Sequence, residues 1–198
     1  LVCQRGQLMD KAAQENKGAM VAVLKLTPEK VEEIAARFDK TYPVNYNSPI
    51  QTVVATTEEN AEALMEAVKA EKGKPVRLAV SGAFHSPFMS SAAKGLGEYL
   101  ADKQLNDPTV EIYSNVTAQP YSGSYKELIT RQVESPVQWQ KTVENLIDLG
   151  VDTFIEIGPG KTLTGFLKKI NRNVKALHIE KTEDLEAVRK ELSVNAEE

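Results

Sequence analysis

The chain has 198 residues, 41% of them hydrophobic, which is enough to bury one large core or two small ones. Its 24 basic and 28 acidic side chains give a net charge of 24 − 28 = −4 without a long basic run, which argues against nucleic-acid binding. One cysteine, Cys3, excludes an intrachain disulfide and suits a reducing cytoplasm. No apolar run approaches the ~18 residues of a membrane span, and no signal peptide is evident, so we expect a soluble cytoplasmic protein.

The first part of the chain has the pattern of a small unit of alternating strands and helices. Between Gly18 and Ala83 the order is strand, helix, strand, strand, helix, strand. The predicted ranges are Met20–Leu26, Pro28–Phe38, Val44–Asn47, Thr52–Thr56, Ala61–Ala70 and Val76–Ser81. Thr27 is expected to cap the first helix, and Thr57 or Asn60 the second. This β-α-β-β-α-β order is that of the ferredoxin-like unit.

The second part alternates helices and strands as an α/β layer structure with a mainly parallel sheet does. The predicted helices are Pro87–Asp102, Tyr125–Gln132, Val137–Leu149, Thr162–Ile170 and Leu185–Leu192, and the predicted strands are Val110–Tyr113, Thr153–Ile157 and Val174–His178. The polar tail Ser193–Glu198 is expected to fray.

One of only two histidines lies where a predicted strand gives way to a helix. The alternation from Val76 to Val80 stops at Gly82, and Pro87 is suited to the first position of a helix, so His85 should lie on the junction loop. A general base would be expected at such a place, because imidazole titrates near neutral pH and strand ends are common functional positions. Taken alone, His85 is better explained as a structural loop residue.

Six segments considered together change that interpretation. They are Arg5-Gly6-Gln7-Leu8-Met9, Asn45-Tyr46-Asn47-Ser48-Pro49, Ala83-Phe84-His85-Ser86, Tyr113-Ser114-Asn115-Val116-Thr117, Arg131-Gln132-Val133-Glu134-Ser135-Pro136-Val137-Gln138-Trp139 and Glu156-Ile157-Gly158-Pro159-Gly160-Lys161-Thr162-Leu163. In this order and spacing the chain resembles the malonyl-CoA:acyl carrier protein transacylases of type II fatty acid synthesis and, more distantly, polyketide synthase acyltransferase domains. The resemblance implies malonyl transfer from coenzyme A to the phosphopantetheine thiol of an acyl carrier protein.

The resemblance also implies an α/β fold in which a large α/β hydrolase-like acyltransferase subdomain carries an inserted ferredoxin-like subdomain. Residues 1–17 would be a helix of the large subdomain, 18–83 the small subdomain, and 84–198 the C-terminal part of the large one. The family's nucleophile lies in a Gly-His-Ser-Leu-Gly type elbow, and this chain has no G-x-S-x-G. We therefore expect the C-terminal portion of a longer enzyme, with a preceding segment that supplies the serine, and no transfer by these residues alone.

Three residues receive direct roles from the resemblance. His85 matches the histidine that takes the proton from the serine, a group that needs a base within hydrogen-bond reach. Gln132 aligns with the residue whose backbone carbonyl orients that histidine, so its side chain should be replaceable. Arg5 matches the arginine that holds the malonyl carboxylate through two parallel hydrogen bonds. The alternatives are an ordinary polar helix end for Gln132 and, for Arg5, a surface ion pair with Asp10 or Glu15.

Five further residues are weaker candidates for substrate binding. The resemblance implies that Phe84 forms a wall of the acyl pocket and favours malonyl over methylmalonyl groups, and that Asn45 and Asn47 line the thioester entrance. Asn115 could bind an amide or the acyl carbonyl, and Met9 could pack beside the acyl group. Each also has a structural explanation, because asparagines are common in turns and Phe and Met are common in cores.

Other chemistry is not supported. Gly160-Lys161-Thr162 opens a helix after a strand, but the first glycine of a phosphate loop would fall at Ile155. His178 is expected to be a packed strand residue, and two distant histidines and one cysteine give no metal-ligand spacing. We expect no cofactor besides the coenzyme A thioester as substrate. The alternative function is a non-catalytic ferredoxin-like module, formed by residues 18–83, for ligand binding or protein docking.

Overall fold

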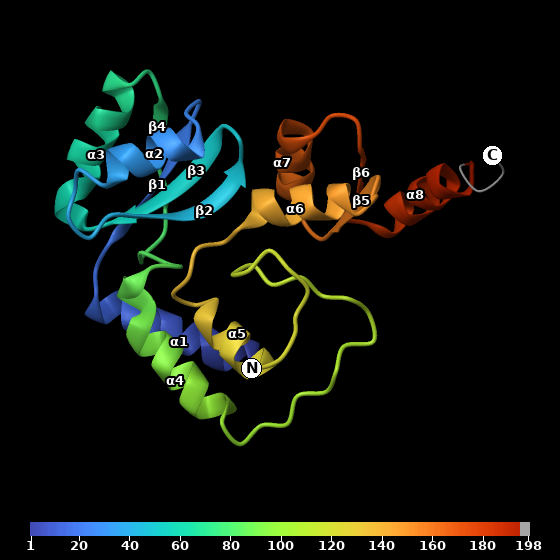
Figure 1. The fold of residues 1–198 in the computed structure, drawn as a ribbon, viewed down its shortest axis with the longest axis horizontal. Helices are drawn as coiled ribbons and strands as arrows, with labels where there is room; N and C mark the ends of the chain where they lie inside the picture. The colour runs from blue at the N-terminus through green and yellow to red at the C-terminus, as the bar shows by residue number, and fades with distance from the viewer. Residues whose placement is uncertain (195–198) are drawn as a thin grey trace. The chain divides into compact units, whose positions relative to one another are not determined.

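A computed structural model describes residues 1–194 of the chain (Figure 1). The chain divides into two compact units, Leu1–Thr142 and Val143–Glu198, and each mixes helices with strands. No helix in residues 1–194 combines the length and apolar character needed to cross a membrane. The subdomain limits expected from the resemblance, after residues 17 and 83, both fall inside the first unit and stay a prediction.

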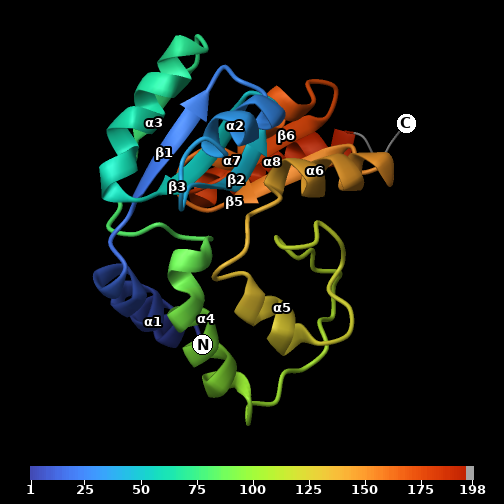
Figure 2. The same cartoon turned by 60° about the vertical axis from the view of Figure 1, so that its left-hand side comes forward.

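The first unit contains the predicted β-α-β-β-α-β order after an N-terminal helix. The elements are α1 (Val2–Glu15), β1 (Ala19–Leu24), α2 (Pro28–Ala35), β2 (Tyr42–Ser48), β3 (Gln51–Thr56), α3 (Glu58–Ala70) and β4 (Lys74–Arg77). The four strands form one sheet in the order β2-β3-β1-β4, and each neighbouring pair is antiparallel. Both α2 and α3 lie on one face of this sheet (Figures 1 and 2).

Strand β1 is buried on both of its faces, and this determines where the core lies. Val21 and Val23 face the two helices and pack in a cluster with Ile34 of α2 and Leu64 of α3. Met20 and Ala22 face the other way and belong to a second cluster, whose other buried members are Val44, Val53, Ala55 and Ala83. The sheet is therefore covered on one side by helices and on the other by the junction loop that carries His85.

Local sequence signals explain where the helices of this sheet begin. The Thr27 side chain accepts a hydrogen bond from the backbone N–H of Lys30 at 3.4 Å, and Thr57 does the same for Asn60 at 3.2 Å. Threonine at this position satisfies one of the N–H groups that the first helical turn leaves unpaired. Thr57, and not Asn60, is thus the cap of α3.

One predicted strand has different bounds in the structure, and another is absent from it. Strand β4 ends at Arg77, although the alternation of apolar residues continues to Val80, and its four residues pair with Val21–Leu24 of β1. One further hydrogen bond joins the Leu78 N–H to the Met20 carbonyl, and the chain then leaves the sheet. The segment 110–113 is not a strand, and within it Tyr113 makes only an isolated bridge to Pro120.

The helices outside the sheet region of the first unit pack around α4. A 3-10 turn at Pro87–Met89 leads into α4 (Ser90–Leu100), so the predicted helix 87–102 is shorter and begins less regularly. The helix α5 (Tyr125–Arg131) follows a long irregular connection, and α4 contacts both α1 and α5 (Figure 2). Their shared core consists of Ala12, Ala13, Met89, Ala92, Ala93, Leu96, Leu100 and Val133.

The second unit begins at Val143, within α6 (Trp139–Asp148). It contains β5 (Thr153–Ile157), α7 (Thr162–Ile170), β6 (Lys175–Ile179) and α8 (Thr182–Val194). Strands β5 and β6 pair in parallel, as expected of a strand-helix-strand connection, and Ile157 at the end of β5 is 79% exposed. Ser193 and Val194 belong to α8, and the rest of the predicted tail lies outside the described residues.

The helix-facing core should carry much of the stability of the first unit. Leu64 is fully buried there, so Leu64→Ala should lower the free energy of unfolding by about 2–5 kcal/mol through lost burial and a residual cavity. Urea denaturation followed by circular dichroism measures this change. The matched control is Val110→Ala, because Val110 is 71% exposed and its truncation should change stability by less than about 0.5 kcal/mol. Equal losses in the two variants would contradict this description of the core.

Candidate active site

The loop that carries His85 is held by short-range contacts. The Ser86 hydroxyl donates to the Ala83 carbonyl at 2.6 Å and accepts from the Phe88 N–H at 3.3 Å, which caps the 3-10 turn. His85 itself has a φ of 59°, a left-handed conformation that a residue with a side chain seldom adopts. Such strain is found where surrounding contacts over-determine the backbone, often at functional sites.

Gly18 allows this loop to approach the sheet. A Cβ atom on Gly18 would lie 2.8 Å from both the Ala83 Cβ and the Thr56 carbonyl oxygen. Real Cβ atoms do not approach backbone oxygen so closely, so only glycine fits here. The position of the histidine loop is thereby tied to the start of β1.

The imidazole is oriented by a backbone carbonyl. His85 Nδ1 lies 2.8 Å from the carbonyl oxygen of Gln132, the residue that ends α5, as the resemblance led us to expect. The carbonyl can only accept, so Nδ1 carries the proton and donates. The Nε2 atom is then left with a free lone pair, which is the form of histidine that acts as a base.

The environment also keeps this ring neutral. Burial lowers the pKa of His85 below 6.5, the carbonyl of Gln132 partly offsets the effect, and the positive charge of Arg5 lowers the pKa further. A backbone hydrogen bond with Ser135 acts in the opposite direction. The net lowering means that the unprotonated ring predominates at neutral pH.

Arg5 closes the first turn of α1, and its positive charge acts on His85. The surface ion pairs considered for it do not form. Asp10 instead accepts a hydrogen bond from Gln14 at 2.9 Å, and Glu15 pairs with Lys11 at 3.8 Å. Within residues 1–194, Arg5 has no carboxylate partner, and its side chain is partly buried. A half-buried cation without a counter-ion suits a site for an anionic group.

The segment that follows Gln132 brings the candidate asparagines to the same region. The Val137 N–H donates to the Val44 carbonyl at 2.8 Å, and the Val137 carbonyl accepts from the Tyr46 N–H at 3.0 Å. Asn45, between these two β2 residues, thus lies beside Val137 in a parallel bridge. The next residue, Gln138, donates its N–H to the carbonyl of Asn115 at 2.9 Å.

The other candidates have packing contacts. Met9 packs against the core shared by α1 and α4, and Phe84 packs against that core and against the open face of the sheet. Asn47 is partly buried on β2, next to an irregularity in the pairing of β2 with β3. These positions are compatible with pocket walls and equally with structural roles.

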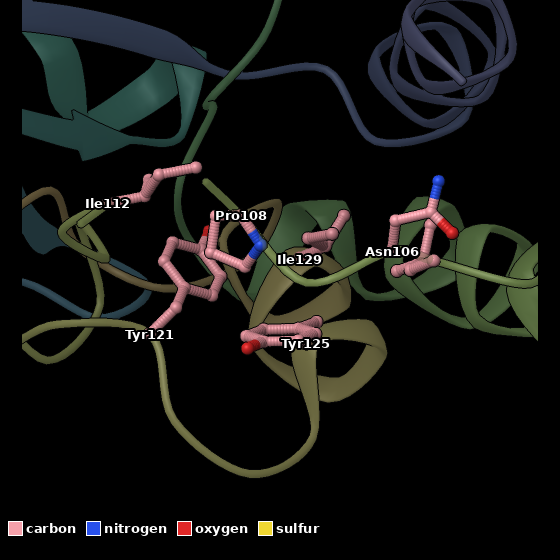
Figure 3. A pocket seen from close by; sticks show the side chains of 7 residues that line it. Asn106, Pro108, Ile112, Tyr121, Tyr125 and Ile129 are labelled. Carbon is pink, nitrogen blue, oxygen red and sulfur yellow. The ribbon is translucent and has the colours of Figure 1, made fainter. Parts of the chain in front are cut away.

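Tyr121 is a residue of this region that the sequence did not predict. The side-chain amide of Gln132, the residue whose carbonyl orients His85, donates a hydrogen bond to the Tyr121 hydroxyl. Tyr121 also lines a cavity of about 320 Å³ (Figure 3). The other residues that line this cavity are Leu105, Asn106, Pro108, Ile112, Tyr125 and Ile129. The sequence feature that could have drawn attention to Tyr121 is the pair of tyrosines, Tyr121 and Tyr125, on either side of a Ser-Gly-Ser turn.

The apparent phosphate loop is explained by a carboxylate. Glu156 accepts hydrogen bonds from the N–H groups of Leu163 at 3.1 Å and Thr164 at 2.7 Å, so it occupies the start of α7 where a phosphate would bind. His178 Nε2 lies 3.0 Å from the Gly158 carbonyl on the neighbouring turn, which agrees with a structural role. In the part of the chain that the structure describes, no three metal-ligating side chains come together.

Comparison with known proteins identifies the class of this fold and site. The family model for the acyl transferase domain matches residues 1–194, and the chain belongs to this family. The chain is 41% identical over 192 residues to the malonyl CoA-acyl carrier protein transacylase of Staphylococcus aureus strain MSSA476, a match that covers 93% of the chain and 62% of that protein.

Solved structures agree with this assignment. The malonyl CoA-acyl carrier protein transacylase of Clostridium perfringens ATCC 13124 is 40% identical, with a TM-score of 0.92 over 98% of this chain and 64% of that chain. A malonyl-transacylase in complex with its type II PKS acyl-carrier protein is 33% identical, with a TM-score of 0.87 over 91% of this chain and 60% of that chain. The chain therefore spans somewhat less than two thirds of the length of the relatives it matches.

The charge of Arg5 should be visible in the titration of His85. The cation of Arg5 disfavours the imidazolium form of His85. Arg5→Met keeps the aliphatic stem but removes this cation, so the pKa of His85 should rise towards 6.5. Histidine NMR titration measures it. Lys11→Met, on the exposed side of the same helix, is the control and should leave the His85 pKa unchanged. A His85 pKa that does not move in Arg5→Met would place the guanidinium away from the ring.

Proposed function

We propose that this chain is part of a malonyl-CoA:acyl carrier protein S-malonyltransferase. Such an enzyme moves a malonyl group from coenzyme A to the phosphopantetheine thiol of an acyl carrier protein through a serine acyl-enzyme. The observation that carries the proposal is the neutral His85 ring held by the Gln132 carbonyl, with the unpaired charge of Arg5 acting on it. The names of the relatives and the family membership support the same activity.

The proposed reaction has two symmetrical halves. His85 Nε2 takes the proton of the serine hydroxyl as its oxygen attacks the thioester carbonyl, and the resulting imidazolium returns the proton to the departing thiolate of coenzyme A. In the second half, His85 takes the proton of the carrier thiol, whose sulfur attacks the acyl-serine, and returns it to the serine oxygen. The serine belongs to a Gly-His-Ser-x-Gly segment that this sequence does not contain.

Arg5 is proposed to select the acyl group by binding the free malonyl carboxylate. A guanidinium can bind a carboxylate through two parallel hydrogen bonds, which fixes orientation as well as charge. An uncharged acyl group would leave the partly buried cation unpaired, at a cost of about 1–3 kcal/mol. Selection of malonyl thus follows from the absence of any carboxylate partner for Arg5 within residues 1–194.

The weaker candidates have proposed positions around the same substrate. Phe84 would form a wall that leaves no room for an α-methyl branch, and Met9 would pack beside the acyl group. Asn45, Asn47 and Asn115 would line the approach of the pantetheine arm. The contacts of Val137 and Gln138 with the strand of Asn45 and the loop of Asn115 support placing these groups near His85.

The finer architecture is also part of the proposal. The β-α-β-β-α-β order and the antiparallel sheet order β2-β3-β1-β4 support a ferredoxin-like subdomain over residues 18–83, inserted in a hydrolase-like domain formed from residues 1–17, residues 84–198 and the segment with the serine. Acyl transfer from a thioester to a hydroxyl needs a base and oxyanion donors, so we propose no metal or redox cofactor. A cytoplasmic location is proposed from the single cysteine.

The non-catalytic module stays the alternative because the sequence has no nucleophile elbow. Mass spectrometry of the chain after incubation with malonyl-CoA distinguishes the two. For the enzyme, we expect these residues alone to bind malonyl-CoA without a covalent adduct, and a polypeptide that also contains the serine segment to become acylated. A polypeptide that contains both parts and is never acylated would favour the module.

Arg5→Ala should reveal the selectivity. In the polypeptide that carries the serine, this change should lower kcat/KM for malonyl transfer by about 10- to 100-fold, because charge-assisted hydrogen bonds are lost. Transfer of an acetyl group, which has no carboxylate, should be unchanged or faster. Parallel assays with malonyl-CoA and acetyl-CoA measure the ratio, and an equal loss for both substrates would remove the selective role of Arg5.

His85→Ala should remove the base. Acylation at neutral pH should slow by about 10²- to 10⁴-fold, the range typical of general base catalysis. Rapid-quench measurement of the acyl-enzyme gives the rate. His178→Ala is the matched control, since it removes the second histidine of these 198 residues, which bonds to the Gly158 carbonyl, and should leave the rate per folded molecule unchanged. A normal burst of acyl-enzyme in His85→Ala would exclude this residue as the base.

A further inference from the structure

Tyr121 closes the loop that carries Asn115. The Tyr121 N–H donates to the Ile112 carbonyl at 2.8 Å, and the Ser114 N–H donates to the Gln119 carbonyl at 2.9 Å. Ser114 is fully buried, so these bonds hold a compact loop with Tyr121 at its end. The tyrosine is therefore anchored by its own backbone, independently of α5.

The Tyr121 hydroxyl connects this loop to Gln132. It accepts a hydrogen bond from the side-chain amide of Gln132 and another from the side chain of Ser114. Burial raises the pKa of Tyr121, and the two hydrogen bonds partly offset that effect. The ring lies 6.1 Å from the ring of Tyr125, centroid to centroid, along one wall of the cavity (Figure 3).

The end of α5 needs such an anchor. This helix has only seven residues, Tyr125–Arg131, and none of them is buried. A helix so short is marginal without tertiary contacts. Gln132 and the buried Val133 follow the last residue of α5. The contacts of these two residues therefore determine where the last carbonyl groups of the helix lie.

We propose that Tyr121 is a positioning residue for His85. Its hydroxyl holds the Gln132 side chain, so that the main-chain carbonyl of the same residue stays in line with Nδ1 of the imidazole. The chain of contacts runs from the Asn115 loop through Tyr121 and Gln132 to His85. The importance of Tyr121 for catalysis rests on the proposed function. The contact between Tyr121 and Gln132 is independent of that function.

This role revises the expectation that the Gln132 side chain is replaceable. The carbonyl alone makes the bond to His85, but its direction depends on how the residue at the end of this short helix is held. Loss of the tether should weaken the preference for the Nδ1-protonated tautomer, because that preference comes from one well-aligned acceptor.

The test is the tautomer of His85 in the chain labelled with 15N-histidine. Long-range 1H–15N NMR at alkaline pH, where the ring is neutral, distinguishes a protonated Nδ1 from a protonated Nε2, and His178→Asn assigns the two rings. The Nδ1-protonated form should dominate in the unmodified chain. Tyr121→Phe should shift the tautomer ratio by about threefold towards Nε2, as expected for a modest hydrogen-bond effect.

Tyr125→Phe is the matched control. It removes a hydroxyl from the same cavity, and that hydroxyl interacts with Asp107 instead of Gln132. Its tautomer ratio should equal that of the unmodified chain. An unchanged ratio in Tyr121→Phe, or the same shift in both variants, would overturn the proposal.

Gln132→Ala removes the same tether from its other end. It should shift the ratio as Tyr121→Phe does, and the double variant should shift it no further, because both changes remove one interaction. Additive shifts would show two independent effects and contradict the proposal. If Tyr121→Phe folds poorly, the tautomer ratio of the single variant Gln132→Ala decides the question. The readout involves no acyl transfer, so failure of the proposed function would leave its result intact.

Discussion

One hydrogen bond organises the candidate site, the one between His85 Nδ1 and the Gln132 carbonyl. Because the acceptor belongs to the main chain, the orientation of the ring depends on where α5 ends and on what fixes that end. A carboxylate in the same place would raise the pKa of the histidine strongly, whereas a neutral carbonyl orients it with a smaller effect on its charge. The site thereby obtains an oriented and neutral base.

The same bond explains why residues so far apart in the chain belong together. The sheet holds the histidine loop from one side through Gly18 and Ala83, and α1 brings the charge of Arg5 from another. Like charges discourage protonation of the ring, so the arginine proposed to bind substrate also helps to keep the base free. When a carboxylate binds that arginine, this repulsion should weaken, and the imidazolium formed during catalysis should become more stable.

The sequence predicted the elements of the small sheet well because their signals are local. Caps at Thr27 and Thr57 and regular apolar spacing are independent of distant contacts. The segments 78–81 and 110–113 were misread because alternation reports which side chains are apolar, not whether a neighbouring strand is present. The roles expected for Arg5 and His85 came from family resemblance. Their proximity depends on tertiary packing, which local sequence patterns do not report. Tyr121 was missed because its significance lies in a single hydroxyl contact.

The second unit has a physical property of its own. Its two parallel strands, β5 and β6, present Ile155 and Ile157 to solvent, and each strand has an unpaired edge within residues 143–194. Backbone groups along an uncovered edge readily accept another extended chain, and apolar side chains beside them strengthen that addition. The edges of β5 and β6, with the apolar side chains beside them, are therefore suited to receive a further strand of a larger sheet.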